Sequence, residues 1–389
     1  MKSLVKNRKL LKATACVLLM VPILSGCLGV KGDTSRIELI SSTTSDGWTF
    51  DYYRNRAYPC AVSGYQTFVV GRKVGSSSTA TRPLWVRMHG GGIGWFNPDG
   101  SVAGGTRNKS EEPFSRLKPS IGSTNLEGRI AASADGYRML SVSMCSHDMY
   151  SGVNNTDPNN PNLTNGATPK TNGLLATKAA IAFVTAKYPT NDFFLHGGSA
   201  GAAGSFSVAW SLQLEGMVPA GVVADAGVMN QAYENEQVAM GSPCARPSEG
   251  AAIFMQRIHP DIANPANQPH LLVADGRLSV PIMQVYSSGD NNTCGTMAMK
   301  CPLPNGTSVT LGSAVCNARP LRMAIEAQGP ASRSVSLELC VDDPNQDSGT
   351  NKCDKHVATN GEYLNTAPGI PADFESVILD WVNQRRGDD

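Results

Sequence analysis

The sequence lacks any long basic tract, and outside its first 26 residues it lacks any long apolar run. Lysine plus arginine total 33 against 32 acidic residues, so the charge balance does not favour a nucleic-acid partner. A single apolar run also excludes a polytopic membrane protein. No CxxC pair occurs and the six histidines are scattered, so no metal-ligand spacing is present and no cofactor is implied. Solenoids and propellers are disfavoured because no repeat of roughly 20 to 50 residues is found.

The N-terminus has the layout of an export signal. Basic residues are followed by an apolar segment at 13–24, which is too short to span a bilayer comfortably. The segment ends in Leu-Ser-Gly-Cys27, which resembles the bacterial lipobox, where the cysteine is acylated and becomes the mature first residue. The alternative is an ordinary cleaved signal beside a chance cysteine. We therefore expect a signal peptide at 1–26, a lipid on Cys27, a tether at 27–35, and a cell-envelope lipoprotein of the outer membrane.

Cysteine usage agrees with export. Eight cysteines remain outside the signal and the lipobox, and an even number in an exported chain favours disulfides over zinc. They are Cys60, Cys145, Cys244, Cys294, Cys301, Cys316, Cys340 and Cys353. The pairing of Cys340 with Cys353 is the one we predict, because they bracket a short polar loop.

From residue 36 the pattern is that of an α/β protein. Alternating side chains over 36–72 predict antiparallel strands. Beyond residue 84, short apolar runs alternate with helical stretches, which predicts a mainly parallel sheet with helices on both faces. The predicted strands are 84–88, 139–144, 193–195, 222–224, 282–285 and 335–339, and the predicted helices are 175–186, 202–214, 317–327 and 374–381. We expect one catalytic domain over 36–389.

Three long insertions interrupt this pattern at 97–130, 151–172 and 229–277. Each follows the end of a predicted strand, on the side where such sheets bind ligands. Two interpretations remain open for each insertion: the wall or lid of a pocket, or decoration of the surface.

The strongest chemical signal is Gly197-Gly-Ser199-Ala-Gly201, placed between a predicted strand and a helix of small residues. A nucleophilic serine on such a sharp turn needs small neighbours two positions away, so that strand and helix do not clash. The competing interpretation is a plain glycine-rich turn. We predict Ser199 as a nucleophile.

A second glycine-rich turn, His89-Gly-Gly91-Gly92, ends an earlier strand. Its amides, with that of Ala200, are the predicted oxyanion hole, since such donors stabilise a developing negative charge. A phosphate cradle is disfavoured because the Lys-Ser/Thr of a P-loop is missing. The neighbouring Trp95, Phe96 and Tyr150 are candidates for lining a substrate pocket, with burial in the core as the alternative.

The base and acid of a serine triad are expected downstream, in the order Ser, Asp, His. Asp290 follows a buried strand, and His356 is the only histidine beyond it. These are the predicted acid and base. The competing acids are Asp225, at the end of the preceding strand, and Asp342 or Asp354 near the histidine.

The order of elements is similar to the α/β-hydrolase fold. Four segments resemble the pectin acetylesterase and Notum carboxylesterase family: the first glycine-rich loop with Trp95-Phe-Asn97, the stretch 144–152, the Ser199 turn, and Ala-Asp225-Ala-Gly. The resemblance implies the same triad and oxyanion hole, and it gives Asp225 a supporting role. The chain departs from the family in Gly-Ile-Gly-Trp95-Phe, where Trp and Cys commonly follow the glycines directly.

These signals predict an exported serine esterase that acts on carboxylic esters, with acetyl esters among the expected substrates. Its expected partners are the ester substrate and the membrane that holds its lipid. The alternatives are a polyester, feruloyl or lipid esterase of the same fold, and a hydrolase-fold lipoprotein that binds without catalysis.

Overall fold

The computed structural model describes residues 30–104, 109–162, 170–227, 264–290, 298–302, 307–339, 356–360 and 374–386. The predicted signal peptide, the lipidated Cys27, the Cys340–Cys353 bridge and the competing acids Asp342 and Asp354 lie outside these residues. Within the described chain, no helix combines the length and hydropathy needed to cross a membrane.

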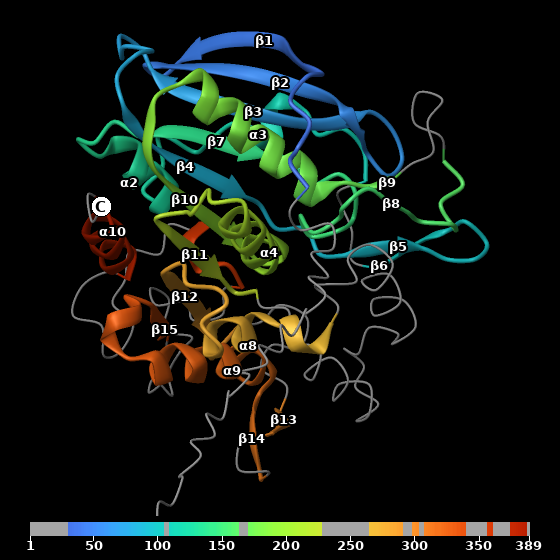
Figure 1. The fold of residues 1–389 in the computed structure, drawn as a ribbon, viewed down its shortest axis with the longest axis vertical. Coiled ribbons are helices and arrows are strands. Elements are labelled where there is room, and N and C mark those ends of the chain that lie inside the picture. Colours follow the sequence, from blue (N-terminus) through green and yellow to red (C-terminus); the bar gives the residue numbers. More distant parts are fainter. Residues whose placement is uncertain are drawn as a thin grey trace, which may run out of the picture.

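A nine-stranded sheet in the order β1-β2-β3-β7-β4-β10-β11-β12-β15 forms the centre of the molecule (Figure 1). Its strands are β1 Ile37–Ser45, β2 Trp48–Pro59, β3 Tyr65–Lys73, β7 Arg138–Val142, β4 Arg82–Met88, β10 Thr190–Gly198, β11 Gly221–Asp225, β12 Ile282–Ser287 and β15 Val335–Leu339. The first three strands and the β3–β7 pair are antiparallel, and all pairs from β7 to β15 are parallel. This is the strand order of the α/β-hydrolase fold.

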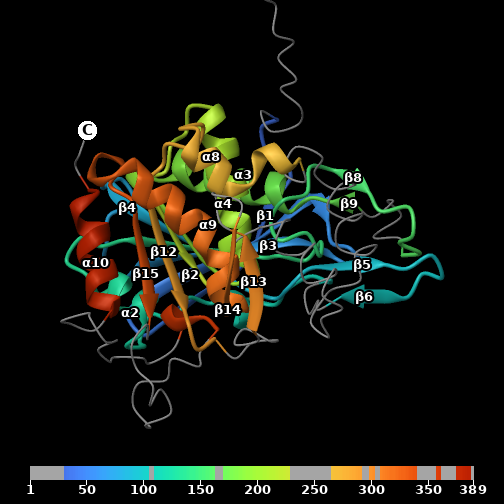
Figure 2. The same ribbon diagram turned by 90° about the horizontal axis from the view of Figure 1, so that it is seen from below.

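Helices cover both faces of this sheet (Figure 2). One face carries α3 Gly173–Lys187, α4 Ala200–Leu214, α8 Pro269–Ala274 and α9 Ser313–Gln328, and the other carries α1 Phe114–Leu117, α2 Leu126–Ala132 and α10 Phe374–Gln384. Each strand supplies both faces, because its successive side chains point in opposite directions. In β4, for example, Leu84 and Val86 lie in the core under α3 and α4, while Trp85 lies in the core under α2 and α10.

Short elements extend this frame. Small two-stranded sheets are formed by β5 Gly94–Phe96 with β6 Val102–Gly104, by β8 Asn155–Thr156 with β9 Lys170–Thr171, and by β13 Ala298–Pro302 with β14 Ser308–Gly312. Three 3-10 turns are η2 Pro265–Asn267, η3 Pro330–Ser332 and η4 Ala358–Asn360. Disulfides join Cys60 to Cys145 and Cys301 to Cys316.

The predicted strands and helices are all present, with ends shifted by a few residues. Parts of two insertions belong to the body of the fold, and residues 229–263 lie outside the described chain. The insertion 97–130 ends in α2, whose Leu126 and Ile130 are fully buried in the core, and 229–277 contains α8, which packs on α9. Residues 30–35, which belong to the predicted tether, contact the body of the protein, as described below.

Candidate active site

Ser199 occupies a strained turn between β10 and α4. Its φ of 53° and ψ of −118° are rare for a residue with a side chain, and such conformations persist only where the surroundings hold them. Here the Ser199 amide donates a 2.8 Å hydrogen bond to the Asp225 carbonyl. A side chain on Gly201 would overlap the Met88 carbonyl, and one on Gly197 would overlap Gly201 itself. Glycine at both positions therefore lets strand and helix approach closely enough to present the serine.

The structure brings the three predicted triad residues into one hydrogen-bonded chain. Nδ1 of His356 lies 2.7 Å from Oδ2 of Asp290, and Nε2 lies 2.7 Å from Oγ of Ser199. A carboxylate beside Nδ1 favours the tautomer with its proton there. Nε2 is then free to accept the Ser199 proton, which is the arrangement a nucleophilic serine requires.

Asp225 lies next to this triad. The structure records no hydrogen bond between Asp225 and His356. Its Oδ2 accepts from the amide of Thr359 at 2.6 Å and from the Thr359 hydroxyl at 2.8 Å. The same hydroxyl lies 2.9 Å from Nε2 of His196, in β10. Burial raises the pKa of Asp225 to about 6 and lowers that of His196 to about 3. This network binds the turn that follows His356 to the centre of the sheet, which fits the supporting role expected for Asp225.

The predicted oxyanion residues flank the nucleophile. A Cβ on Gly90 would lie 3.1 Å from Cβ of Ser199, so the loop that contains Gly91 and Gly92 begins directly beside the serine. Gly92 has a φ of 73°, which turns the loop. Ala200 is the first residue of α4, where the amide has no acceptor within its own helix. The oxyanion hole formed by these three amides stays a prediction.

A buried hydrogen bond holds the base of this loop. Nε2 of His89 lies 2.7 Å from Oε2 of Glu112, and its Nδ1 lies 2.7 Å from the Gly90 carbonyl. His89 and Glu112 are 7% and 3% exposed. Glu112 was not predictable from the sequence, because it lies in an insertion and belongs to no recognisable motif.

The predicted substrate-lining aromatic residues are core residues in the structure. Tyr150 is completely buried, and its hydroxyl donates to the His89 carbonyl at 3.1 Å. Trp95 belongs to the core under α3 and α4, and Phe96 stacks on His147 with ring centroids 5.4 Å apart. The prediction that Tyr150 contacts substrate is corrected, since its whole side chain packs beneath the glycine-rich loop.

The segment that resembles the family motif at 144–152 supports the loop from below. The carboxylate of Asp148, fully buried, accepts from the amide of Gly173 at 2.6 Å and from that of Tyr150 at 3.2 Å. Burial raises its pKa to about 6. The adjacent Cys145 is fixed by its disulfide to Cys60. Asp148 thereby ties the start of α3 to the residues under the active site.

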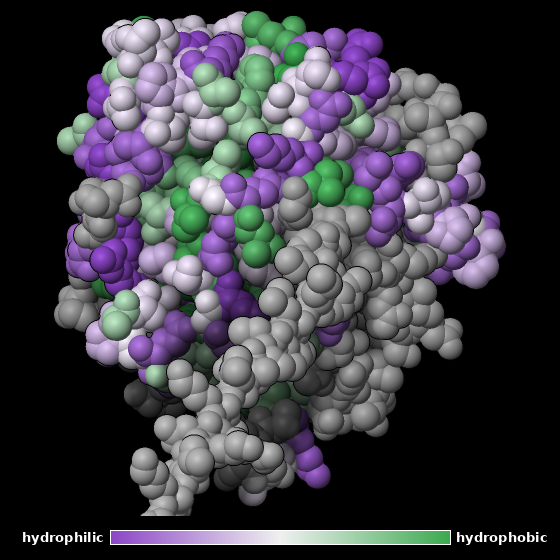
Figure 3. Space-filling model, viewed as in Figure 1, coloured by the Kyte–Doolittle hydropathy of each residue, from purple (hydrophilic) through white to green (hydrophobic). Residues whose placement is uncertain are grey.

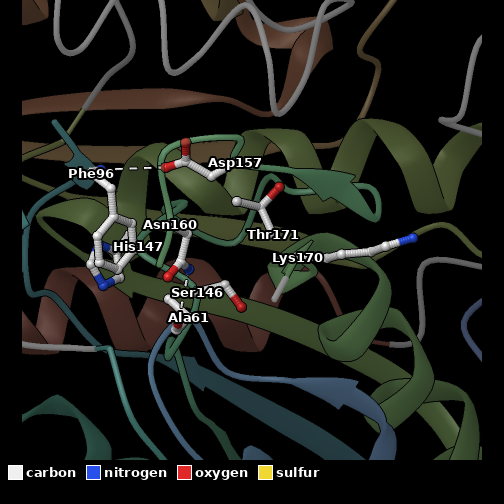
Figure 4. Close-up of a pocket in the computed structure, with 8 residues that line it drawn as sticks. All are labelled: Ala61, Phe96, Ser146, His147, Asp157, Asn160, Lys170 and Thr171. Carbon is white, nitrogen blue, oxygen red and sulfur yellow. Dashed lines mark hydrogen bonds between the residues drawn. The ribbon is translucent and has the colours of Figure 1, made fainter. Parts of the chain in front are cut away.

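A small hollow opens beside this segment (Figure 4). The His147 ring stacks against Phe96, while Asp157 accepts a 3.3 Å hydrogen bond from the Phe96 amide. Burial lowers the pKa of His147 to about 4, so this ring is neutral near pH 7. The hollow has room for roughly one water molecule, too little for an ester substrate. Among the residues that the structure describes, no cluster of side chains could hold a metal ion.

The chain is similar, at low sequence identity, to solved structures of two esterases and of an S-formylglutathione hydrolase. No protein-family model and no curated sequence matches the chain. Acetyl xylan esterase 1 from Thermoanaerobacterium is 12% identical, with a TM-score of 0.44, over 92% of this chain and 91% of that protein. An S-formylglutathione hydrolase from Agrobacterium tumefaciens is 12% identical, with a TM-score of 0.43, over 77% of this chain and 88% of that one. Brefeldin A esterase, a bacterial homologue of human hormone-sensitive lipase, is 14% identical, with a TM-score of 0.41, over 90% and 76%.

Proposed function

We propose that this chain is a serine carboxylesterase. The observation that carries the proposal is the continuous chain of hydrogen bonds from Ser199 through His356 to Asp290, at an elbow that lies beside a glycine-rich loop. A serine hydroxyl is a weak nucleophile unless a base removes its proton, and this geometry supplies both the base and the acid that orients it.

In this mechanism Oγ of Ser199 attacks the ester carbonyl carbon while its proton moves to Nε2 of His356. The amides of Gly91, Gly92 and Ala200 bind the resulting oxyanion. The tetrahedral intermediate collapses, the C–O bond to the alcohol breaks, and His356 returns the proton to the leaving oxygen. Water then attacks the acyl-serine and loses a proton to His356. The second collapse breaks the acyl C–O bond to Ser199, whose Oγ takes that proton back from His356 as the acid is released.

We further propose that the enzyme is exported, anchored through a lipid on Cys27, and active on acetyl esters of a polysaccharide. The export signal and lipobox of the sequence support the first two parts. The four segments that resemble the pectin acetylesterase and Notum family support the third.

Labelling with a fluorophosphonate probe tests the proposed mechanism. We expect the wild type to be labelled, Ser199→Ala to be silent, and His356→Ala to be labelled orders of magnitude more slowly. Ser205→Ala is the matched control, because Ser205 lies buried within α4 and its hydroxyl donates to the Ala202 carbonyl. Unchanged labelling of Ser199→Ala and His356→Ala would overturn the triad. A wild type that neither reacts nor hydrolyses esters would identify a binding protein.

A panel of acetyl, butyryl and aryl esters with acetylated polysaccharides tests the substrate. We expect the highest kcat/KM on the acetylated polymers. A clear preference for long acyl chains would contradict the acetyl assignment while leaving the serine mechanism intact.

A further inference from the structure

The chain just beyond the lipobox is bound to the body of the protein. Nζ of Lys178, in α3, donates a 2.7 Å hydrogen bond to the Val30 carbonyl. A side chain on Gly32 would overlap the backbone of Ala179, so the segment lies in direct contact with α3. The start of the described chain passes over α3 in Figure 1. Residues from Val30 onwards are therefore fixed on the surface of this helix.

Two further contacts hold the same segment on β2. The Asp33 amide donates to the Tyr58 hydroxyl at 2.6 Å, and Nδ2 of Asn55 donates to the Asp33 carbonyl at 2.8 Å. With Val30 bound on one side and Asp33 on the other, this part of the chain has little freedom to act as a spacer.

Lys178 also places Val30 near the C-terminal end of α4. The ammonium group donates to the Ser211 hydroxyl at 2.8 Å and forms an ion pair with Glu215, directly after α4. The Lys178 side chain is 1% exposed and that of Glu215 is 12% exposed, so the ion pair at this junction of α3, α4 and the N-terminal segment is largely shielded from water. Leu214, the last residue of α4, is thus close to the junction.

Apolar side chains are exposed around this junction. Val30, Leu214 and Val218 are 50%, 55% and 51% exposed, and they are three of the seven large hydrophobic side chains that are exposed in the described chain. Figure 3 shows hydrophobic side chains among hydrophilic ones on the face over α3 and α4. We call Val30, Leu214 and Val218 the apolar patch.

The short distance between Val30 and the proposed lipid on Cys27 indicates what covers this patch. Three residue steps separate Cys27 from Val30, and a fully extended chain spans at most about 3.6 Å per residue, or about 11 Å in all. A diacylated cysteine is held at the membrane interface. We propose that the apolar patch rests on the lipid bilayer, so that the enzyme is held in one orientation and does not swing on a tether. This inference rests on the proposed anchoring at Cys27 and is independent of the esterase mechanism.

The proposed orientation also bears on the nucleophile. Ser199 precedes the first residue of α4 and Leu214 is its last, and a 15-residue helix is about 22 Å long. The nucleophile therefore lies at the opposite end of this helix from the membrane contact. The nucleophile is thus separated from Leu214, in the apolar patch, by about the length of α4.

Tryptophan quenching by brominated lipids tests the orientation. Full-length protein, with its lipid verified by mass, is inserted into phosphatidylcholine vesicles whose acyl chains carry bromine. We expect several-fold stronger quenching of the added tryptophan in Leu214→Trp and Val218→Trp than in Val74→Trp, each measured against the wild type. Val74 is the matched control, because it is 54% exposed, close to the 55% of Leu214, and directly follows β3.

Each outcome has a definite meaning. Equal quenching at positions 214 and 74 would overturn the orientation, and so would shielding of position 214 without vesicles, which indicates a second copy of the chain on the patch. Absence of lipid on the purified protein, or vesicle binding by Cys27→Ala equal to that of the wild type, would overturn the anchoring on which the proposal rests. Turnover of a soluble aryl acetate by every variant reports the esterase separately, so loss of turnover with the quenching pattern intact would count against the mechanism alone.

Discussion

The elbow around Ser199 and the turn that carries His356 belong to the same triad, but different forces hold them. At the elbow, backbone packs on backbone, and glycines at 197 and 201 remove the side chains that would prevent it. The histidine turn, 356–360, is held by polar contacts, in which Thr359 binds the buried Asp225. A steric overlap either occurs or does not occur, whereas the stability of a hydrogen-bond network is the sum of several small free-energy contributions. The elbow should therefore break abruptly, and the histidine turn should weaken step by step.

The largest expected effect is the difference in kcat between variants of the two carboxylates near the histidine turn. Asp290→Asn should lower kcat by about four orders of magnitude, because an amide stabilises the wrong imidazole tautomer. Asp225→Asn should cost much less, since the recorded hydrogen bonds of the Asp225 carboxylate go to Thr359 and not to His356. Steady-state kinetics on a soluble acetate ester measure both. The reverse order would show that Asp225 is the functional acid.

At the elbow, Gly201→Ala should destabilise the fold by about 3 kcal/mol or more, because the new methyl group overlaps the Met88 carbonyl and cannot be relieved by a rotamer change. Urea denaturation followed by tryptophan fluorescence gives the change in the free energy of unfolding. Gly122→Ala is the control, since a Cβ there meets nothing within 4 Å. Equal stability of the two variants would disprove close packing at the elbow.

The pH dependence of stability examines the polar network. Burial raises the pKa of Asp225 from 3.8 to about 6, so the folded protein binds this proton more tightly than the unfolded chain does. The corresponding stability, roughly 3 kcal/mol, is fully present below about pH 4 and is lost as the pH rises through about 6. Asp225→Asn should remove this pH-dependent contribution. Unfolding of both proteins at pH 4, 5, 6 and 7 measures it, and parallel curves would contradict the prediction.

The smallest expected effect comes from one hydroxyl in that network. Thr359→Val removes the bonds to Asp225 and His196 but keeps the backbone bond, so kcat should fall about tenfold with little change in KM. Thr177→Val is the matched control, because the Thr177 hydroxyl is buried with no partner that the structure records. If both variants retained full activity, the turn would not depend on this hydroxyl.

Much of the fold was predictable, because β4, β7, β10, β11, β12 and β15 of the central sheet each contain a short apolar run bounded by turn residues. The nucleophile was predictable for a related reason: a sharp turn between strand and helix tolerates only small residues, and that requirement is local. Asp290 and His356 were predicted from their order in the chain. The structure places His356 beside Ser199, and Asp290 beside His356.

Other parts of the site depend on contacts between distant segments. Glu112 supports His89 from an insertion without a motif, and Thr359 reaches Asp225 across 134 residues of sequence. Tyr150 lies beside a motif, which suggested a substrate contact, but burial inside the core decided its role. Neither periodicity nor spacing carries this information.

The sequence by itself determined the order of strands and helices and the residue types of the candidate triad, because hydrophobic periodicity and steric limits act over a few neighbouring residues. Only the tertiary structure decided which carboxylate meets His356, which insertions are core, and where residues 30–35 lie. Those outcomes depend on side chains far apart in the chain competing for the same partners, and that competition is settled only when the sheet and its helices pack.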